Sequence, residues 1–136
     1  MDTYKLNPIG SIRSPLKTRN EAPRQGDEGA PEAWIEILPQ FTVALSGLAQ
    51  GDEVLLFTWL HLSHRDVLEV HPRNERQNPL TGVFATRSPD RPNPIGLHRV
   101  RILAIEPPTR LRVGPLEAVD GTPVIDLKPV LSRSER

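Results

Sequence analysis

Prolines recur along the whole chain, and their spacing limits what this sequence can fold into. There are 15 prolines in 136 residues, about twice the average usage. A proline fixes φ and removes a backbone N–H donor, so it interrupts helices and the interior of sheets. The sequence therefore predicts short strands separated by turns and not a helical bundle. A chain of this length can bury one core, and we expect a single domain over residues 1–130 followed by a frayed tail at 131–136.

Apolar patterning predicts a mainly β fold, a barrel or a sandwich, with one or two short helices and long proline-rich loops. We expect strands at residues 4–12, 33–38, 53–60, 66–70, 97–105, 110–113 and 124–129. The run at 53–60 is the most apolar in the chain and suits a strand buried on both faces. Helical spacing of apolar residues predicts a short helix at 39–48. Residues 16–31 lack periodicity and form a long polar loop.

Residues 82–97, GVFATRSPDRPNPIGL, combine three prolines with charged and amide side chains. Each proline pushes the residue before it towards extended conformations, so the loop is held to one restricted path. Arg87, Arg91 and Asn93 are thereby positioned in advance, and a partner loses less entropy in ordering them. The stretch indicates a binding loop. The alternative for Arg91 and Asn93 is that they hydrogen-bond the loop to itself.

The charge of the chain is unevenly distributed although the net charge is zero. Residues 71–101 contain six arginines and two acids, whereas residues 20–60 contain seven acids and only Arg24 as a base. A neutral chain argues against nucleic acid, but a basic loop region favours an anionic ligand. Arg73, Arg91 and Asn93 are candidates for holding a substrate phosphate or carboxylate, because arginine offers a bidentate fork.

Several classes of site are disfavoured. Without cysteine there is no disulfide, thiolate metal site or cysteine nucleophile. His61, His64 and His71 have no cysteine or carboxylate at metal-ligand spacing, so we expect no metal. Phosphate-loop and dinucleotide-binding glycine patterns are missing. No apolar run approaches the roughly 18 residues of a membrane span, and we expect no membrane association and a soluble, cytoplasmic protein.

Two further polar residues have open readings. His61 follows the apolar run at 53–60 directly, and a histidine delivered by a buried strand is a common ligand contact. A strand-end histidine without function is equally compatible with this position. Asp120 begins the turn Asp120-Gly121-Thr122-Pro123, and an aspartate there commonly caps its own turn.

The loop at 82–97, taken with DGTPVIDLKP at 120–129, resembles the TsaA-like (YaeB/TrmO) family. The resemblance extends from Pro8-Ile9-Gly10 and Arg13-Ser14-Pro15 to Lys128-Pro129. It implies a small β-barrel that forms a homodimer and binds S-adenosyl-L-methionine near the subunit boundary. By position it implies the cofactor contacts Pro23, Arg24, Gln25, His61, Leu62, Arg87, Arg99, Asp120, Gly121, Thr122, Pro123 and Val124.

The resemblance further implies a methyltransferase that acts on N6 of threonylcarbamoyl-adenosine beside the anticodon of tRNA. A carbamoylated N6 is a poor nucleophile and must lose its proton, which requires a nearby acceptor; we expect Asp126 in that role. The neutral charge, and the end of this sequence soon after Lys128-Pro129 where longer bacterial members continue, leave two alternatives. One is methylation of a small molecule, and the other is a cofactor-binding dimer without turnover.

Overall fold

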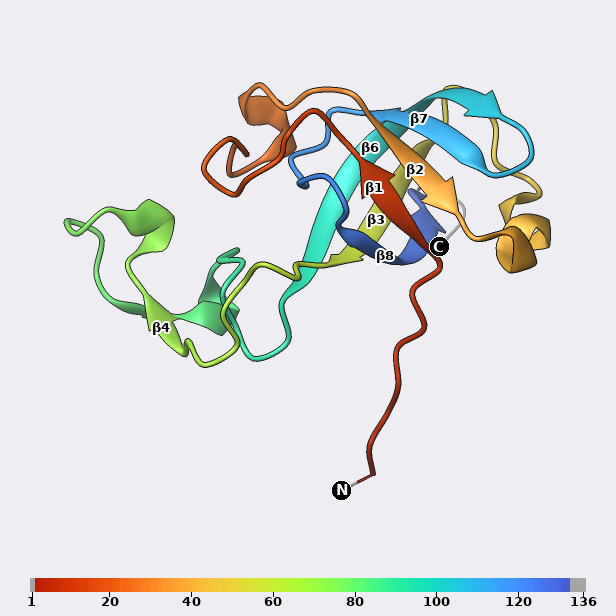
Figure 1. Cartoon of the computed structure of the whole chain (residues 1–136). Coiled ribbons are helices and arrows are strands. Elements are labelled where there is room, and N and C mark those ends of the chain that lie inside the picture. The colour runs from red at the N-terminus through yellow and green to blue at the C-terminus, as the bar shows by residue number, and fades with distance from the viewer. Residues whose placement is uncertain (1, 133–136) are drawn as a thin grey trace.

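The computed structural model describes residues 2–132 and consists mainly of β-strands (Figure 1). Six strands form a closed barrel with antiparallel neighbours throughout. In order around the barrel they are β1 (Gly10–Arg13), β2 (Ala33–Ile37), β7 (Arg110–Gly114), β6 (Ile95–Glu106), β3 (Glu53–Trp59) and β8 (Pro123–Pro129). A separate two-stranded sheet pairs β4 (Glu69–Val70) with β5 (Thr81–Gly82). The prediction of a mainly β fold is confirmed.

Helical structure within residues 2–132 is limited to 3-10 segments. These are η1 (Gly26–Glu28), η2 (Pro39–Leu45), η3 (Pro72–Asn74) and η4 (Val83–Ala85). The helix predicted at 39–48 corresponds to η2. Its first residue is Pro39, and the N–H that proline lacks would have no partner within the helix at this position. Its Phe41 and Leu45 pack against the core, and Gly47, with φ of 99°, follows its end. No helix in the described part of the chain is long and apolar enough to cross a membrane.

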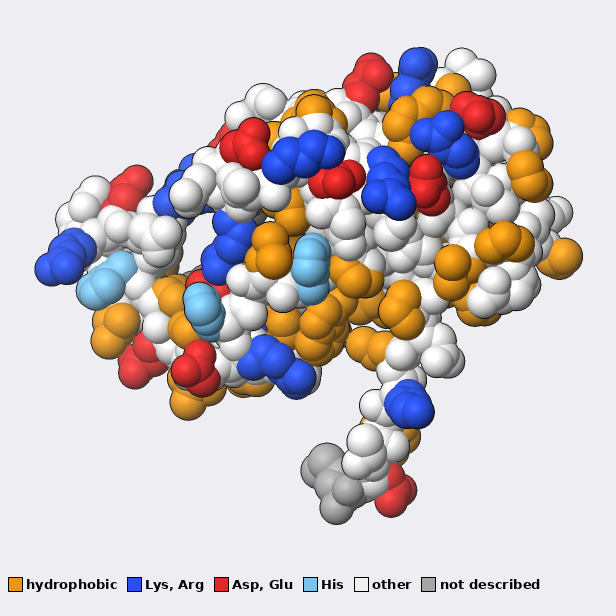
Figure 2. Space-filling view, in the orientation of Figure 1, with side chains coloured by type: hydrophobic (Ala, Val, Ile, Leu, Met, Phe, Trp, Pro, Cys, Tyr) orange, Lys and Arg blue, Asp and Glu red, His pale blue; other side chains and the backbone are white. Residues whose placement is uncertain are grey.

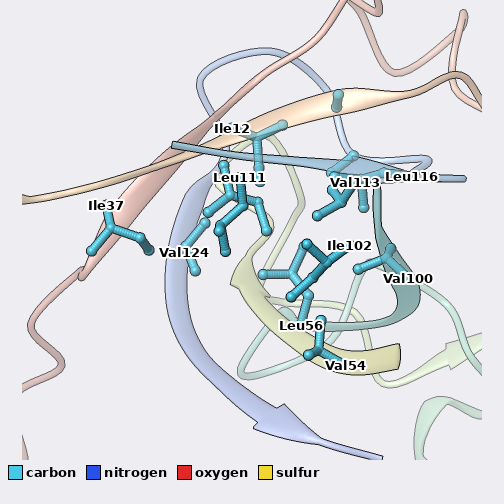
Figure 3. Close-up of a cluster of buried hydrophobic side chains, with 13 residues drawn as sticks. Ile12, Ile37, Val54, Leu56, Val100, Ile102, Leu111, Val113, Leu116 and Val124 are labelled. Carbon is cyan, nitrogen blue, oxygen red and sulfur yellow. The ribbon is translucent and has the colours of Figure 1, made fainter. Parts of the chain in front are cut away.

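Alternate residues of the strands fill the barrel (Figure 3). The largest fully buried side chains on the strands are Ile12, Ile35, Val54, Leu56, Val100, Ile102, Leu111, Val113 and Val124. Burial of one such side chain contributes about 1.5–3 kcal/mol. The period of two along a strand is what allows one face of every strand to meet inside a closed sheet.

The prediction that the strand at 53–60 is buried on both faces is wrong. In β3 the buried residues alternate with partly exposed ones, namely Leu55, Phe57 and Trp59. A barrel strand has one interior and one exterior face, so an unbroken apolar run leaves half its side chains outside. On the neighbouring strand Ile95 and Leu97 are also exposed, at 46% and 39%. The outer faces of β3 and β6 therefore carry a group of exposed or partly exposed apolar side chains near the start of β6.

Two predicted strands are shorter in the structure. The strand expected at 4–12 begins at Gly10, because Pro8 has no N–H to donate to a neighbouring strand. At Gly10 the backbones come so close that a Cβ would lie 2.1 Å from the Glu36 carbonyl oxygen. The strand expected at 66–70 is reduced to β4. The tail expected at 131–136 lies largely outside the described residues.

Three connections leave the same end of the barrel. They are the first loop (residues 14–32, between β1 and β2), the excursion (residues 60–94, between β3 and β6) and the final connection (residues 115–122, between β7 and β8). Figure 1 shows these segments on the left, with the excursion reaching out beyond the barrel. We call this the site end, because most residues predicted to bind ligand are on these connections.

Candidate functional site

The first loop and the excursion are joined through Asp90. Its carboxylate accepts the backbone N–H of His64 at 2.8 Å and pairs with Arg19 at 3.3 Å. Arg19 also donates to the Leu62 carbonyl at 3.3 Å. These bonds place the segment after β3, which carries His61 and Leu62, against the first loop. Both of those predicted contacts are exposed at the surface.

Arg24 and Arg73, predicted for cofactor and substrate respectively, lie side by side. Arg24 donates to the Arg73 carbonyl at 2.8 Å, and Arg73 donates to Glu28 at 2.7 Å. Arg73 and Asn74 have φ of 58°, a left-handed conformation uncommon for residues other than glycine. The Arg73 hydrogen bond is the main cause of a pKa of Glu28 below its ordinary value. The structure thus brings the Pro23-Arg24-Gln25 segment to the excursion.

Arg91 and Asn93 are both hydrogen-bonded within the protein. The Arg91 guanidinium donates to the carbonyls of Ser88 at 2.9 Å and Thr86 at 2.7 Å, and also to that of Val83. Asn93 accepts from Arg65 at 2.9 Å. The Arg91 contacts match the alternative in which the residue hydrogen-bonds the loop to itself, whereas Asn93 joins the loop to Arg65 outside it. A substrate contact by either one stays a prediction.

Arg87 differs from Arg91 in having a free guanidinium. It is exposed, and within residues 2–132 its side chain has no hydrogen bond or ion pair. Leu62 is 46% exposed. Arg87 thus presents an unpaired cation on a stiff loop, and Leu62 presents an apolar surface on the same excursion; these groups suit an anionic and a partly apolar ligand respectively.

The turn at 120–124 is attached to the first loop. Asp120 accepts the Ser14 backbone N–H at 2.9 Å and pairs with Lys17 at 3.3 Å. Asp120 thus caps a distant segment. Gly121 has φ of 82°, a conformation that favours glycine. The side chains of Thr122 and Val124 are buried, and the Thr122 N–H, the Thr122 carbonyl and the Val124 carbonyl are hydrogen-bonded within the protein.

Arg99 and Asp126 lie on barrel strands and not on the three connections. Arg99 is opposite Leu55, and Asp126 is opposite Phe57, on the two strands that flank β3. Arg99 pairs with Glu53 at 2.8 Å, and Asp126 accepts the Leu127 N–H and pairs with Lys128 at 3.5 Å. Both side chains are therefore on the barrel wall. Within residues 2–132 neither side chain is hydrogen-bonded or ion-paired to another predicted residue.

The sequence reasoning missed a buried polar row. His98 Nε2 lies 2.8 Å from Thr58 Oγ1, and His98 Nδ1 is hydrogen-bonded to Glu117 Oε1. Strand parity was the available signal, because His98 alternates with Gly96 and Val100 and so shares their inward face. His71, considered for metal binding, has Nδ1 bonded to the Asn78 carbonyl at 2.8 Å. Residues 2–132 contain no group of three or more histidine and acidic residues arranged to hold a metal.

A groove of about 530 Å³ lies beside the two ends of the first loop, where it joins β1 and β2. It is lined by Arg13, Ser14, Pro15, Lys17, Glu32, Ala33, Trp34, Arg112 and Asp120. Of the predicted residues only Asp120 contributes to it. The other predicted residues therefore do not line this groove.

Two archaeal proteins are similar to this chain over most of its length. A probable S-adenosyl-L-methionine-binding protein of Methanothermobacter thermautotrophicus is 46% identical over 125 residues, which are 92% of this chain and 88% of the relative. An S-adenosyl-L-methionine-binding protein of Archaeoglobus fulgidus is 44% identical over 123 residues, covering 90% and 86%.

The same fold occurs in a solved structure. TrmO from Pseudomonas aeruginosa matches with a TM-score of 0.77 and 34% identity, over 100% of this chain and 58% of that one. This chain therefore spans less than two thirds of the TrmO structure. The family model of the tRNA-methyltransferase O N-terminal domain matches residues 11–136. The resemblance predicted from the loop and turn motifs is confirmed, and the chain belongs to the tRNA-methyltransferase O N-terminal domain family.

Proposed function

We propose that this protein is an S-adenosyl-L-methionine-dependent methyltransferase that modifies tRNA, methylating N6 of threonylcarbamoyl-adenosine beside the anticodon. The observation that carries the proposal is the convergence of three motif-bearing connections on the site end. Membership of a tRNA-methyltransferase family and the cofactor named for its relatives support it. We propose a cytoplasmic location, where tRNA would be available.

The site-end residues fit the chemistry of this cofactor, which supplies a methyl group activated by a sulfonium. The unpaired Arg87 guanidinium suits the carboxylate of the methionine portion. Exposed Leu62 offers an apolar surface to the adenine. The carbonyls of Asp120 and Gly121 offer acceptors, whereas the N–H groups of Asp120, Gly121 and Thr122 are bonded within the protein. The segment Pro23-Arg24-Gln25 is on another connection at the same end of the barrel. Alignment of donor and acceptor supplies much of the acceleration in an in-line displacement.

A homodimer is part of the proposal. Arg99 and Asp126 lie on the barrel wall, beside the exposed or partly exposed apolar side chains of Leu55, Phe57 and Leu97. A second copy packed on this apolar wall would cover it and could carry its own site end towards Arg99 and Asp126. Asp126 would then be placed to take the proton that leaves N6.

A small-molecule acceptor is the second candidate, and the surface charge favours it. Figure 2 shows basic (blue) and acidic (red) side chains intermingled on the face that carries β1, β2 and β7. Proteins that bind nucleic acid usually present a predominantly basic surface instead. Ion pairs account for this pattern, among them Arg13 with Glu36 and Arg112 with Glu32. A binding protein without turnover is the third possibility that the family names allow.

Two experiments test the proposal. Isothermal titration with S-adenosyl-L-methionine is expected to give a saturable heat, and no heat at millimolar ligand would reject both enzyme candidates. Mass spectrometry of tRNA nucleosides from a deletion strain is expected to show loss of the methylated threonylcarbamoyl-adenosine. If that nucleoside is unchanged, the tRNA role is rejected and metabolite extracts become the next source of acceptors.

A further inference from the structure

The row Thr58–His98–Glu117 joins three elements at the site end: β3, β6 and the final connection. Its inner end is closed, because Thr58 is fully buried and the His98 side chain is 4% exposed. Its outer end is the Glu117 carboxylate, which is 15% exposed. The connectivity is that of a hydroxyl–imidazole–carboxylate triad, but no ligand can reach the Thr58 hydroxyl. The end of the row that can meet a ligand is therefore Glu117.

The proton positions follow from the partners. A carboxylate can only accept, so His98 Nδ1 carries the proton of the bond to Glu117 Oε1. In a neutral ring, Nε2 then accepts the hydroxyl proton of Thr58. The bond from His98 fixes Glu117 Oε1 in position, and within residues 2–132 Oε2 has no hydrogen bond.

Three other carboxylates at the site end are paired with lysine or arginine. Asp90 pairs with Arg19, Asp120 with Lys17 and Glu28 with Arg73. Among residues 2–132, Glu117 has only His98 as an ion-pair partner. A largely buried carboxylate is costly unless it is paired. A cation carried by a ligand would therefore stabilise the Glu117 carboxylate, because residues 2–132 place no lysine or arginine against it.

Glycines of two sequence motifs make room for the row. A Cβ on Gly96, the last residue of Asn93-Pro94-Ile95-Gly96, would lie 2.3 Å from Thr58 Oγ1 and 2.7 Å from His98 Nε2. A Cβ on Gly26, which follows Pro23-Arg24-Gln25, would lie 3.1 Å from Glu117 Oε2. The free oxygen of Glu117 thus faces the segment proposed to hold the cofactor.

We propose that Glu117 binds the cationic methionine portion of S-adenosyl-L-methionine, and that His98 is a positioning residue that holds the carboxylate in place. This inference rests on the proposed function, because it assigns a further residue to the same site. The cofactor carries a sulfonium and an ammonium, and a carboxylate attracts either. The row gives the site end a fixed anionic group to complement the cationic Arg87.

Three ligands separate the charges in isothermal titrations. S-adenosyl-L-methionine has both cations, S-adenosylhomocysteine keeps only the ammonium, and 5′-methylthioadenosine has neither. We expect Glu117→Gln to weaken S-adenosyl-L-methionine about tenfold more than 5′-methylthioadenosine, as for a lost charged hydrogen bond. If S-adenosylhomocysteine is spared, Glu117 faces the sulfonium; if it is weakened equally, Glu117 faces the ammonium. Equal losses for all three ligands would overturn the inference.

Controls keep the result interpretable. Glu106→Gln makes the same chemical change in an exposed pair with Arg110, at the far end of β6. We expect it to leave the ratio of the affinities for S-adenosyl-L-methionine and 5′-methylthioadenosine unchanged. His98→Ala is expected to reduce the preference for the charged ligand less than Glu117→Gln does. If Glu117→Gln does not fold, Gly26→Ala decides instead, because its methyl group crowds Oε2 while the carboxylate remains. Gly26→Ala is expected to lower the affinity for S-adenosyl-L-methionine relative to that for 5′-methylthioadenosine, and an unchanged ratio of these affinities would overturn the inference. Absence of binding by the wild type would instead reject the proposed function.

Discussion

Asp120 accepts a hydrogen bond from the backbone N–H of Ser14 at 2.9 Å, although the two residues are separated by 106 positions in the chain. The bond joins the first loop to the final connection. It is the main cause of a pKa of Asp120 below the ordinary value, with a further contribution from Lys17. The Asp120 carboxylate thus holds the turn at 120–123 against the segment that carries Arg13-Ser14-Pro15.

This bond predicts a pH-dependent stability. A carboxyl with a folded-state pKa below its unfolded value stabilises the fold above the unfolded pKa, and its contribution is lost as pH falls through the folded pKa. We expect Asp120→Asn to lower the free energy of unfolding by about 1 kcal/mol at pH 7. The difference from wild type is expected to shrink below about pH 4. Urea unfolding at pH 7 and pH 3 measures both, and an equal deficit at the two pH values would contradict a role for the charge.

Arg87 is expected to matter for binding and not for folding, because its side chain has no hydrogen bond or ion pair within residues 2–132. We expect Arg87→Ala to weaken S-adenosyl-L-methionine by about 1–3 kcal/mol without changing the melting temperature. Arg76→Ala removes another exposed arginine of the excursion and is the matched control. An unchanged dissociation constant for Arg87→Ala, measured by titration calorimetry, refutes its assignment to the cofactor.

Arg91 is expected to act through the order of its own loop. Arg91→Ala removes donors to the carbonyls of Val83, Thr86 and Ser88, so the amides of residues 83–90 should exchange hydrogen faster, by about tenfold or more. Hydrogen–deuterium exchange with mass spectrometry measures this in the free protein. If exchange is unchanged and affinity for the acceptor falls, Arg91 contacts the substrate directly and the loop-bracing account is wrong.

Gly96 is expected to be intolerant of substitution. A methyl group there would overlap Thr58 and His98, and overpacking of a well-packed site costs about 1–3 kcal/mol. Gly82→Ala is the control, because a Cβ at Gly82 meets no atom within 4 Å and its φ of −58° suits any residue. Urea unfolding should separate the two variants clearly. Equal stability of both would show that the polar row adapts to the added methyl group.

The apolar wall is expected to form the dimer interface. Leu97→Glu places a charge among the exposed or partly exposed apolar side chains outside β3 and β6, so we expect it to shift a homodimer to monomer in light scattering after size exclusion. Val43→Glu, at an 88% exposed position on η2, should leave the oligomeric state unchanged. A wild-type protein that is monomeric at all concentrations would reject the homodimer and with it the proposed role of Asp126.

Prediction from the sequence succeeded where structure depends on neighbouring residues. The strands near 33–38 and 110–113, and the turn at 120–123, follow from alternation and from proline and glycine, whose effects act over a few positions. The loop at 82–97 was recognised in the same way, together with both readings of Arg91. The helix near 39–48 was found at the right place, although it is a 3-10 segment.

The family membership and the mainly β fold were thus determined by the sequence itself, through local patterns and motif spacing. Only the tertiary structure decided which face of β3 is inside, that Asp120 caps Ser14, that Arg99 and Asp126 lie on the outer wall, and that His98 meets Glu117. Each of these depends on the register in which distant strands pair and on closure of the barrel. One sequence contains no local signal for that register, because the pairing is selected by the packing of the whole core.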